Sequence, residues 1–351
     1  MKLEDLNYKI STDLIATEPK FPRDDSNLLI FNKEMKIIKF KDIIKVLKPR
    51  DLLVVNNTKV LNSSLEGMIE KRKISLNLNK VINKYRNKWS VFIKSNKKVK
   101  EKEEIEFKFG ISCKVCEIVK NTGFIHYNVI FNTTYDELLE ILLKSGDIPI
   151  PPYIKKKRSI KESDNINYQT VFAKKLGAVA SPTASLHFTE KLINKLARRE
   201  INFAFLTLHV NGGTFLPIRE NDPRRHVMHY EKGIIPKSEA EKINKTKING
   251  GRIIAVGTTV LRLLESSKDK NGFIKAFNGE TNIFIKPGWK VNTVDGLITN
   301  FHTPKSTLLM LVYALIGKVN TLKIYKYAIE KKMRFFSYGD ACLLWVSNAK
   351  R

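Results

Sequence analysis

Histidines in loops are the first candidates for chemistry in this chain. Of its six histidines, five lie in polar or glycine-bearing turns beside apolar, strand-like segments: His187, His209, His226, His229 and His302. A neutral imidazole can accept a proton near pH 7, and α/β proteins place ligands in the loops at the carboxyl ends of parallel strands. One such histidine is more often a hydrogen-bonded structural side chain. Their recurrence in separate segments favours a shared site.

Glycine and threonine residues follow two predicted strands, at 201–210 and 252–256. Glycine there lets backbone N–H groups approach a ligand, although an ordinary tight turn uses it too. The second strand is followed by a helix, whose amino end favours an anion or carboxylate. These residues are Gly212, Gly213 and Thr214 after the first strand, and Gly257 and Thr258 after the second. Neither GxGxxG nor GxxxxGK[ST] occurs there, which disfavours Rossmann-type dinucleotide binding and ATP hydrolysis.

Two further segments have the composition of a site for a planar ligand. Residues 177–188 are mostly small before a histidine, which leaves room for a ring but is equally common where elements pack closely. Residues 334–341 interleave a cation, three aromatic rings and a carboxylate. Such a group can stack a splayed-out purine and hydrogen-bond to it, and aromatic packing in the core is the equal alternative.

Metal binding is disfavoured by the spacing of possible ligands. His226, His229 and Glu231 offer three, but the HExxH pattern is absent and Pro223 predicts a loop rather than a helix that would align them. The CxxC at 113–116 is only half of a zinc-ribbon pattern. We therefore expect no metal.

The pattern of elements predicts two kinds of structure. Short alternating segments with regular turns, from about residue 61 to 131, are typical of a small antiparallel barrel. A helix follows between the capping residue Thr134 and Gly146. Elsewhere strands and helices alternate, which predicts a mostly parallel sheet with helices on both faces. A helix is expected from Lys305 to Ile316, just after Pro304.

The simplest architecture is an α/β main domain interrupted by a small antiparallel β-barrel domain. The main domain is then discontinuous, comprising residues 1–60 and 150–351. The inserted barrel domain with its exit helix comprises residues 61–149.

The charge balance predicts a polyanionic partner. The chain has 63 Lys and Arg against 35 Asp and Glu, which gives a net charge of +28. Compositional drift in an AT-rich genome explains much of this excess equally well. Dense clusters at 97–100, 155–158 and 224–225 favour nucleic acid over a small acidic ligand. The longest apolar run, 308–317, is too short to span a bilayer, and no secretion signal is visible, so we expect a cytoplasmic protein without a membrane partner.

Taken together, these segments resemble the S-adenosylmethionine:tRNA ribosyltransferase-isomerase family of queuosine biosynthesis. The resemblance runs collinearly from the first residues to about Trp345. Its most specific strings are NFH followed by PKSTLLMLV at 300–312, and FFSYGDA at 335–341. Shorter ones are DLLV at 51–54, NNT at 56–58, LHF at 186–188, LHV at 208–210 and AVGTT at 255–259.

The resemblance implies an enzyme that moves the ribosyl group of S-adenosylmethionine onto 7-aminomethyl-7-deazaguanine at the wobble position of tRNA. The ribosyl group is isomerised to an epoxycyclopentane, giving epoxyqueuosine with release of adenine and methionine. S-adenosylmethionine is then a co-substrate, tRNA is the partner, and no metal is implied. The implied fold is also a β-barrel inserted in an α/β domain. We expect the enzyme to act as a monomer.

This chemistry assigns roles to the candidate residues. The sulfonium acidifies the ribose C5′–H, so a base must remove that proton, and an acid at the ring nitrogens assists the departure of adenine. The candidate bases are His187, His209, His229 and His302, with Asp295 and Asp340 as orienting or acid groups. Gly212, Gly213, Thr214, Gly257 and Thr258 are expected to shape the S-adenosylmethionine pocket, with Arg262 supporting its carboxylate. The expected base-binding residues are Asn56, Asn57, Arg334, Phe335, Phe336 and Tyr338.

The chain departs from the resembled family at several positions, among them Asn62-Ser63-Ser64, where Pro-Ala-Arg is usual. Where arginine is usual it has Asn27, Lys59, Ser64 and Asn167. Lysine cannot reproduce a bidentate arginine contact. Ser185 replaces a glycine, which requires a negative φ there.

Two other functions remain open from the residues. A non-catalytic RNA-binding protein would use the basic surface without a small-molecule pocket. A metal-dependent hydrolase would use His226, His229 and Glu231 and would lose activity to chelators.

Overall fold

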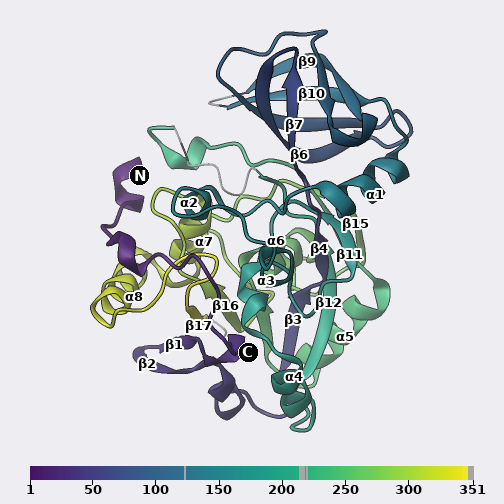
Figure 1. Ribbon diagram of the computed structural model, residues 1–351. Coiled ribbons are helices and arrows are strands. Elements are labelled where there is room, and N and C mark those ends of the chain that lie inside the picture. Colours follow the sequence, from purple (N-terminus) through teal and green to yellow (C-terminus); the bar gives the residue numbers. More distant parts are fainter. Residues whose placement is uncertain (122–123, 213–217, 219, 347–351) are drawn as a thin grey trace.

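The computed structural model describes residues 1–121, 124–212, 218 and 220–346. Figure 1 shows a closed barrel standing beside a larger α/β body. The chain enters the barrel after the short strand β4 (Thr58–Val60) and leaves it through helix α1 (Tyr135–Ser145). The predicted fold class, an α/β main body with an inserted antiparallel barrel, is confirmed. The division at residues 60/61 and 149/150 stays a prediction.

The larger body is built on a nine-stranded sheet. Its strands lie side by side in the order β15 (Phe277–Thr281), β13 (Glu231–Ile235), β12 (Asn202–Leu208), β3 (Leu52–Asn56), β14 (Ile253–Val256), β16 (Gly296–Asn300), β17 (Ala341–Trp345), β1 (Asn27–Asn32) and β2 (Glu34–Lys39). A separate parallel pair joins β4 to β11 (Lys175–Ala178).

The expectation of a mostly parallel sheet is wrong. The four central strands β12, β3, β14 and β16 are parallel, but β13 and β15 add an antiparallel ribbon at one edge. At the other side β17 runs antiparallel to β16, and β1 and β2 form an antiparallel pair. Therefore only in the centre of the sheet do the carboxyl ends of neighbouring strands meet at one edge, as they do in an open α/β fold.

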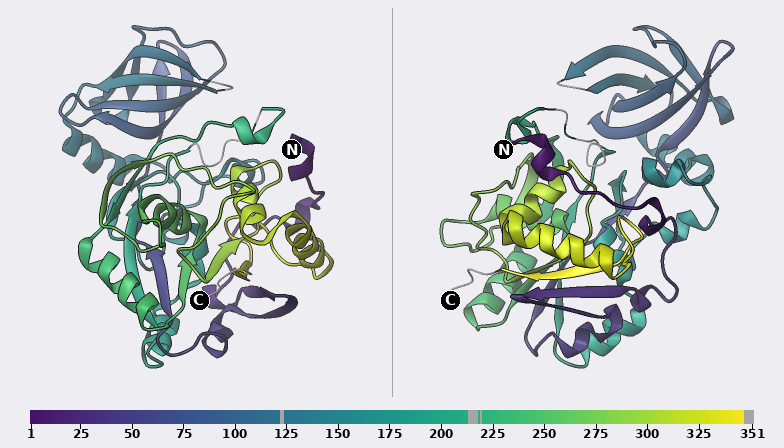
Figure 2. Two further views of the ribbon diagram at one scale, coloured as in Figure 1. Left: turned by 180° about the vertical axis from the view of Figure 1, so that it is seen from behind. Right: turned by 90° about the vertical axis from the view of Figure 1, so that its left-hand side faces the viewer.

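Helices cover both faces of the sheet, as predicted, because alternate strand residues point to opposite sides. Leu52 and Val54 face the core formed with α5 (Lys237–Ile248), α6 (Thr258–Ser267), α7 (Thr307–Ile316) and α8 (Lys318–Glu330). Leu53 and Val55 face the core that includes α4 (Glu190–Ala197). Figure 2 shows α7 and α8 against one side of the sheet. Two short helices, α2 (Pro152–Lys155) and α3 (Asp164–Asn167), follow the barrel.

The barrel has its own hydrophobic core. It closes in the order β10 (Phe124–Phe131), β7 (Lys88–Ser95), β6 (Arg72–Asn83), β5 (Ser64–Ile69), β8 (Glu104–Phe107) and β9 (Ser112–Asn121). Trp89 and Cys113 point inward, and Leu138 and Leu142 of α1 cover the core. The expected Thr134 capping box of α1 is present.

Helix α7 begins two residues later than the sequence predicted. Lys305 takes a positive φ of 55°, which is incompatible with a right-handed helix. The Ser306 side chain instead accepts a hydrogen bond from the N–H of Leu309 at 3.2 Å and caps the helix. Within the described ranges no single helix meets the length and apolarity needed to cross a membrane, although α7 and α8 taken together do, across a bend of 113°.

Candidate active site

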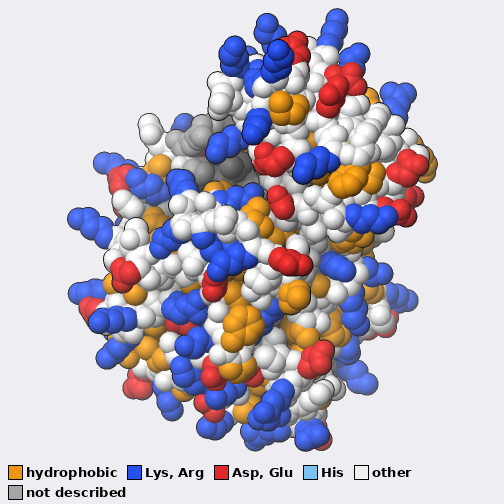
Figure 3. Space-filling view, viewed as in Figure 1, with side chains coloured by type: hydrophobic (Ala, Val, Ile, Leu, Met, Phe, Trp, Pro, Cys, Tyr) orange, Lys and Arg blue, Asp and Glu red, His pale blue; other side chains and the backbone are white. Residues whose placement is uncertain are grey.

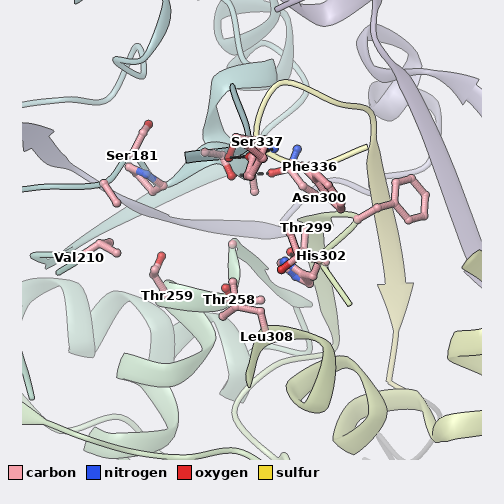
Figure 4. A pocket seen from close by; sticks show the side chains of 18 of the residues that line it. Ser181, Val210, Thr258, Thr259, Thr299, Asn300, His302, Leu308, Phe336 and Ser337 are labelled. Carbon is pink, nitrogen blue, oxygen red and sulfur yellow. Dashed lines mark hydrogen bonds between the residues drawn. The ribbon is translucent and has the colours of Figure 1, made fainter. Parts of the chain in front are cut away.

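A cavity of about 320 Å³ opens at the carboxyl end of the central strands. Gly257 follows β14, Asn300 ends β16, and Val210 lies two residues beyond β12. Because these strands are parallel, their carboxyl ends meet at one edge of the sheet. Figure 4 shows the side chains of Val210, Asn300 and other lining residues around an open centre, with Ser181 and Ser337 on the far side from Thr258 and Leu308.

The amino end of α6 forms one wall of this cavity. Gly257 precedes the helix with φ of 102°, a conformation that side chains disfavour. Its N–H donates to the carbonyl of Ile298 at 2.8 Å, which ties the turn to β16. Thr258 and Thr259 then start the helix within the cavity wall. Free N–H groups of a first turn carry a partial positive charge, so this wall favours an anionic group.

Two buried hydroxyls on the cavity wall have no hydrogen-bond partner among the residues that the structure describes. Ser181 and Thr259 are 7% and 6% exposed, and neither side-chain oxygen has a hydrogen-bond partner within the described part of the chain. Buried polar atoms are nearly always hydrogen-bonded. Both residues line the cavity, so a polar ligand that reaches their side-chain oxygens would satisfy them.

Of the four candidate histidines, His302 alone lines the cavity. Its Nε2 lies 2.9 Å from Oγ1 of Thr299. Its backbone is held on both sides, because its N–H donates to the hydroxyl of Tyr325 at 2.9 Å and its carbonyl accepts from Tyr8 at 2.5 Å. Burial lowers the pKa of His302 to about 3, so the ring is neutral at pH 7. The ring is therefore free to accept a proton, but a pKa so far below pH 7 makes it a weak base.

His187 lies behind the cavity wall. Its Nε2 is 3.2 Å from Nδ2 of Asn300, and its Nδ1 is 2.7 Å from Oγ of Ser26. Asn300 in turn accepts a hydrogen bond from Thr183 at 2.8 Å, and both of these residues line the cavity. Burial lowers the pKa of His187 to about 3, and the ring stacks on Phe40. With both nitrogens engaged, His187 acts on the cavity only through Asn300.

The structure keeps His209 and His229 out of the cavity lining. His209 contacts Oγ1 of Thr58 at 2.8 Å, and its ring fills the space where a side chain at Gly177 would be. Burial lowers its pKa to about 4. His229 lies in a small cleft with Arg262, and burial lowers its pKa as well.

The two candidate carboxylates accept hydrogen bonds from backbone N–H groups. Asp295 stands before β16, at the strand end opposite the cavity, and accepts a hydrogen bond from the N–H of Ile253 at 2.7 Å. Asp340 is 1% exposed and accepts from the backbone N–H groups of Asn27 and Arg334 at 2.8 and 2.9 Å. Neither lines the cavity.

Arg262 and Gly212 lie outside the cavity too. Arg262 is 2% exposed, and its Nη1 forms an ion pair with Glu231 at 2.5 Å. Gly212 donates its N–H to Oδ1 of Asn79 in the barrel at 3.1 Å. Gly213 and Thr214 are outside the described residues.

Most of the residues expected to bind the base are instead buried in the core or form hydrogen bonds within the protein. The Asn56 side chain donates a hydrogen bond to the carbonyl of Leu208 and accepts one from its N–H. The Asn57 side chain accepts a hydrogen bond from the hydroxyl of Thr207. Phe335 is fully buried in the core, and Tyr338 is 3% exposed. The Arg334 side chain donates to the carbonyl of Glu18.

Phe336 is the exception, since it lines the cavity. It takes a positive φ of 70°, which is rare for a large residue. Such strain is often retained at functional sites. Its ring contacts that of Tyr153, another cavity residue, with centroids 5.0 Å apart.

Sequence reasoning missed several cavity residues. Thr299 and Asn300 end a fully buried strand, which is the same signal that identified Gly257. Tyr153 and Lys156 reach the cavity from the segment after the barrel, and no local pattern in the sequence places them there.

The alternative metal ligands have other contacts. His226 Nδ1 lies 3.1 Å from a carboxylate oxygen of Glu220, and Glu231 pairs with Arg262. No group of three or more possible metal ligands occurs among the residues that the structure describes.

Ser185, which stands where the resembled family has glycine, does not have the positive φ that would require glycine. It lies within the short helix at Thr183–His187 and is not among the residues with positive φ. Asn27 has its own role here, because its side chain donates to Asp340 at 3.1 Å.

Comparisons with known proteins agree along the length of the chain. A family model described as "Queuosine biosynthesis protein" matches residues 3–344. An S-adenosylmethionine:tRNA ribosyltransferase-isomerase from Thermoanaerobacter sp. is 45% identical over 351 residues, 98% of this chain and 100% of the relative. The protein of that name from Zymomonas mobilis is 42% identical over 350 residues, 98% of this chain and 99% of the relative. The crystal structure of S-adenosylmethionine tRNA ribosyltransferase from Thermotoga maritima matches with a TM-score of 0.54 and 30% identity, covering 97% of this chain and 99% of that one.

Proposed function

The chain belongs to the S-adenosylmethionine:tRNA ribosyltransferase-isomerase family of queuosine biosynthesis, and we propose that it makes epoxyqueuosine in tRNA. In this reaction the ribosyl group of S-adenosylmethionine is transferred to 7-aminomethyl-7-deazaguanine at the wobble position. The ribosyl group becomes an epoxycyclopentane, and adenine and methionine are released.

The observation that carries this proposal is the convergence on one cavity of His302, the amino end of α6 and two buried hydroxyls that have no partner within the described chain. A neutral base, an anion-binding helix end and free polar groups are what a substrate with a carboxylate, a sulfonium and a ribose requires. S-adenosylmethionine therefore fits the chemistry of the lining.

His302 is the base in this proposal. The sulfonium makes the ribose C5′–H acidic, and the neutral imidazole accepts that proton. Thr299, which contacts Nε2, holds the ring in place. His187 positions Asn300 and does not itself take a proton.

The methionine carboxylate binds the first turn of α6 in this proposal. Thr258 begins that turn, and Gly257 precedes it with its own N–H held by the carbonyl of Ile298, whereas Arg262 is already paired with Glu231. Ser181 and Thr259 bond to the ribose or adenine. Phe336 and Tyr153 lie on the side of the cavity where the nucleobase of tRNA enters.

The test uses purified protein with S-adenosylmethionine and tRNA that carries 7-aminomethyl-7-deazaguanine. We expect adenine release together with a nucleoside whose mass has increased by one ribosyl-derived group. Bound tRNA without either product would overturn the proposal in favour of a non-catalytic RNA-binding protein. Activity that is lost on adding a chelator would instead favour the metal-dependent alternative.

A further inference from the structure

A second cavity, of about 790 Å³, lies between the barrel and the main body. One wall comes from β6 and β7 of the barrel, and the other from residues 149–160, which include α2 (Figure 1). Pro152 and Lys156 line both this groove and the active-site cavity. A ligand in the groove is therefore in direct reach of the active site.

The groove is strongly basic. Its lining contains Lys73 and Lys94 from the barrel, and Lys155, Lys156 and Arg158 from the opposite wall, against one carboxylate, that of Glu66, among the described lining residues. Arg158 is held by Asp164, with two contacts of 2.7 Å. The four lysines form no ion pair with any described residue. Figure 3 shows the wider surroundings, where Lys and Arg side chains outnumber Asp and Glu on this face.

Lysines stand on both walls of the groove. The pKa of Lys155 is lowered by burial, raised by the carboxylates of Asp147 and Glu66, and lowered by the charge of Lys94 across the groove. The cations of the lining outnumber its described carboxylates, so the groove favours a ligand that carries negative charge along its length. An RNA backbone provides a phosphate at every nucleotide.

The remaining lining suits unpaired nucleotides. Ser75, Asn77 and Asn96 offer hydrogen-bonding side chains. Phe92 is half-buried, and its ring edge would lie 3.3 Å from a side-chain carbon placed at Gly212. Cations, amides and an aromatic ring in one groove are typical of sites for single-stranded nucleic acid.

We propose that this groove binds the RNA strand next to the nucleotide being modified. The inference rests on the proposed function, because it assumes that the target base enters the active-site cavity. A base must leave the stack to reach an enclosed site. Its neighbouring phosphates then lie along Lys94 and Lys155, and Lys156 stands where the strand passes from groove to cavity.

The test compares two double variants with equal loss of charge. Lys94→Gln with Lys155→Gln removes one lysine from each wall. Lys191→Gln with Lys195→Gln is the control, since both lysines are exposed on α4 at the end of the main body away from the barrel (Figures 1 and 2). Binding of the modified-base tRNA is measured at several salt concentrations, S-adenosylmethionine affinity is measured alongside, and the melting temperature reports folding.

We expect the groove variant to raise the Kd for tRNA on the order of tenfold and to lower the salt slope of log K by about 1.5, which is two phosphate contacts. Its affinity for S-adenosylmethionine and its melting temperature should match those of the control. A groove variant that binds tRNA like the control at every salt concentration overturns the proposal. If the wild-type enzyme forms no product but the groove variant still loses tRNA affinity, the proposed reaction fails and the groove assignment stands.

Discussion

Nδ2 of Asn300 lies 3.2 Å from Nε2 of His187, and this contact joins the wall of the active-site cavity to a buried histidine. An amide NH₂ only donates, so Nε2 is the acceptor and Nδ1 carries the proton. That proton points to Ser26. The Asn300 carbonyl is then left to accept from Thr183. His187 thus fixes which end of the amide faces each neighbour.

This arrangement predicts different effects for two substitutions of His187. His187→Gln can still place an acceptor toward Asn300, so turnover should fall only severalfold. His187→Phe keeps the stacking on Phe40 but leaves Asn300 without its acceptor, so turnover should fall about tenfold. Both variants should keep the wild-type pH profile of kcat/KM, because His187 is neutral throughout. A loss of more than a hundredfold in His187→Gln would show that His187 is the base.

The low pKa of His187 also makes the protein sensitive to acid. Its pKa is about 3 in the folded state against 6.5 as the ordinary value, so below pH 6.5 the unfolded chain binds a proton that the folded chain does not. The histidine therefore lowers the free energy of unfolding as pH falls, by about 2 kcal/mol at pH 5. Urea unfolding of wild type and His187→Gln should show their stability difference shrinking by about that amount between pH 7 and pH 5. A constant difference would refute this.

The sequence predicted the architecture because its signals are local. Thr134 and Glu137 specify the start of α1, and the period-two alternation after residue 61 specifies barrel strands. The directions of β17 and β13 were not predictable. The direction of a strand depends on the path by which a long connecting segment brings the chain back to the sheet. The start of α7 was missed for a local reason, the positive φ of Lys305.

The site was predictable only in part. Gly257 and Thr258 were found because a strand, a glycine and a helix follow one another in the chain. His187 and His302 have the same sequence context, yet one lies behind the wall and the other in it. Residue type cannot distinguish the two, because burial and hydrogen-bond partners come from distant segments such as Ser26 and Tyr325.

His302 is predicted to carry the proton transfer. His302→Gln keeps a hydrogen-bonding group beside Thr299 but cannot act as a base near neutral pH. We expect kcat to fall by about 10²–10⁴ while the Kd for S-adenosylmethionine changes little. His126→Gln, in the barrel strand β10, is the matched control. A His302→Gln enzyme within threefold of wild type would exclude this role.

Thr259 offers a test that separates binding from folding. Its hydroxyl is buried without a partner in the described chain, so Thr259→Val should leave the free protein equally or more stable. If S-adenosylmethionine satisfies that hydroxyl, the same variant should raise the Kd for S-adenosylmethionine about three- to tenfold, equivalent to one lost hydrogen bond. Calorimetric binding and thermal melting measure the two effects. Unchanged affinity would remove Thr259 from the proposed site.

The buried pair of Arg262 and Glu231 makes the last prediction. Removing one partner leaves the other charge buried, so Glu231→Gln should lower the free energy of unfolding by about 3 kcal/mol or more. Replacing both, with Arg262→Met and Glu231→Leu, removes both charges and should recover most of that loss. Because Arg262 is committed to Glu231 and does not line the cavity, the folded double variant should bind S-adenosylmethionine within about threefold of wild type. An increase in Kd of tenfold or more in that variant would mean that Arg262, rather than the first turn of α6, holds the methionine carboxylate.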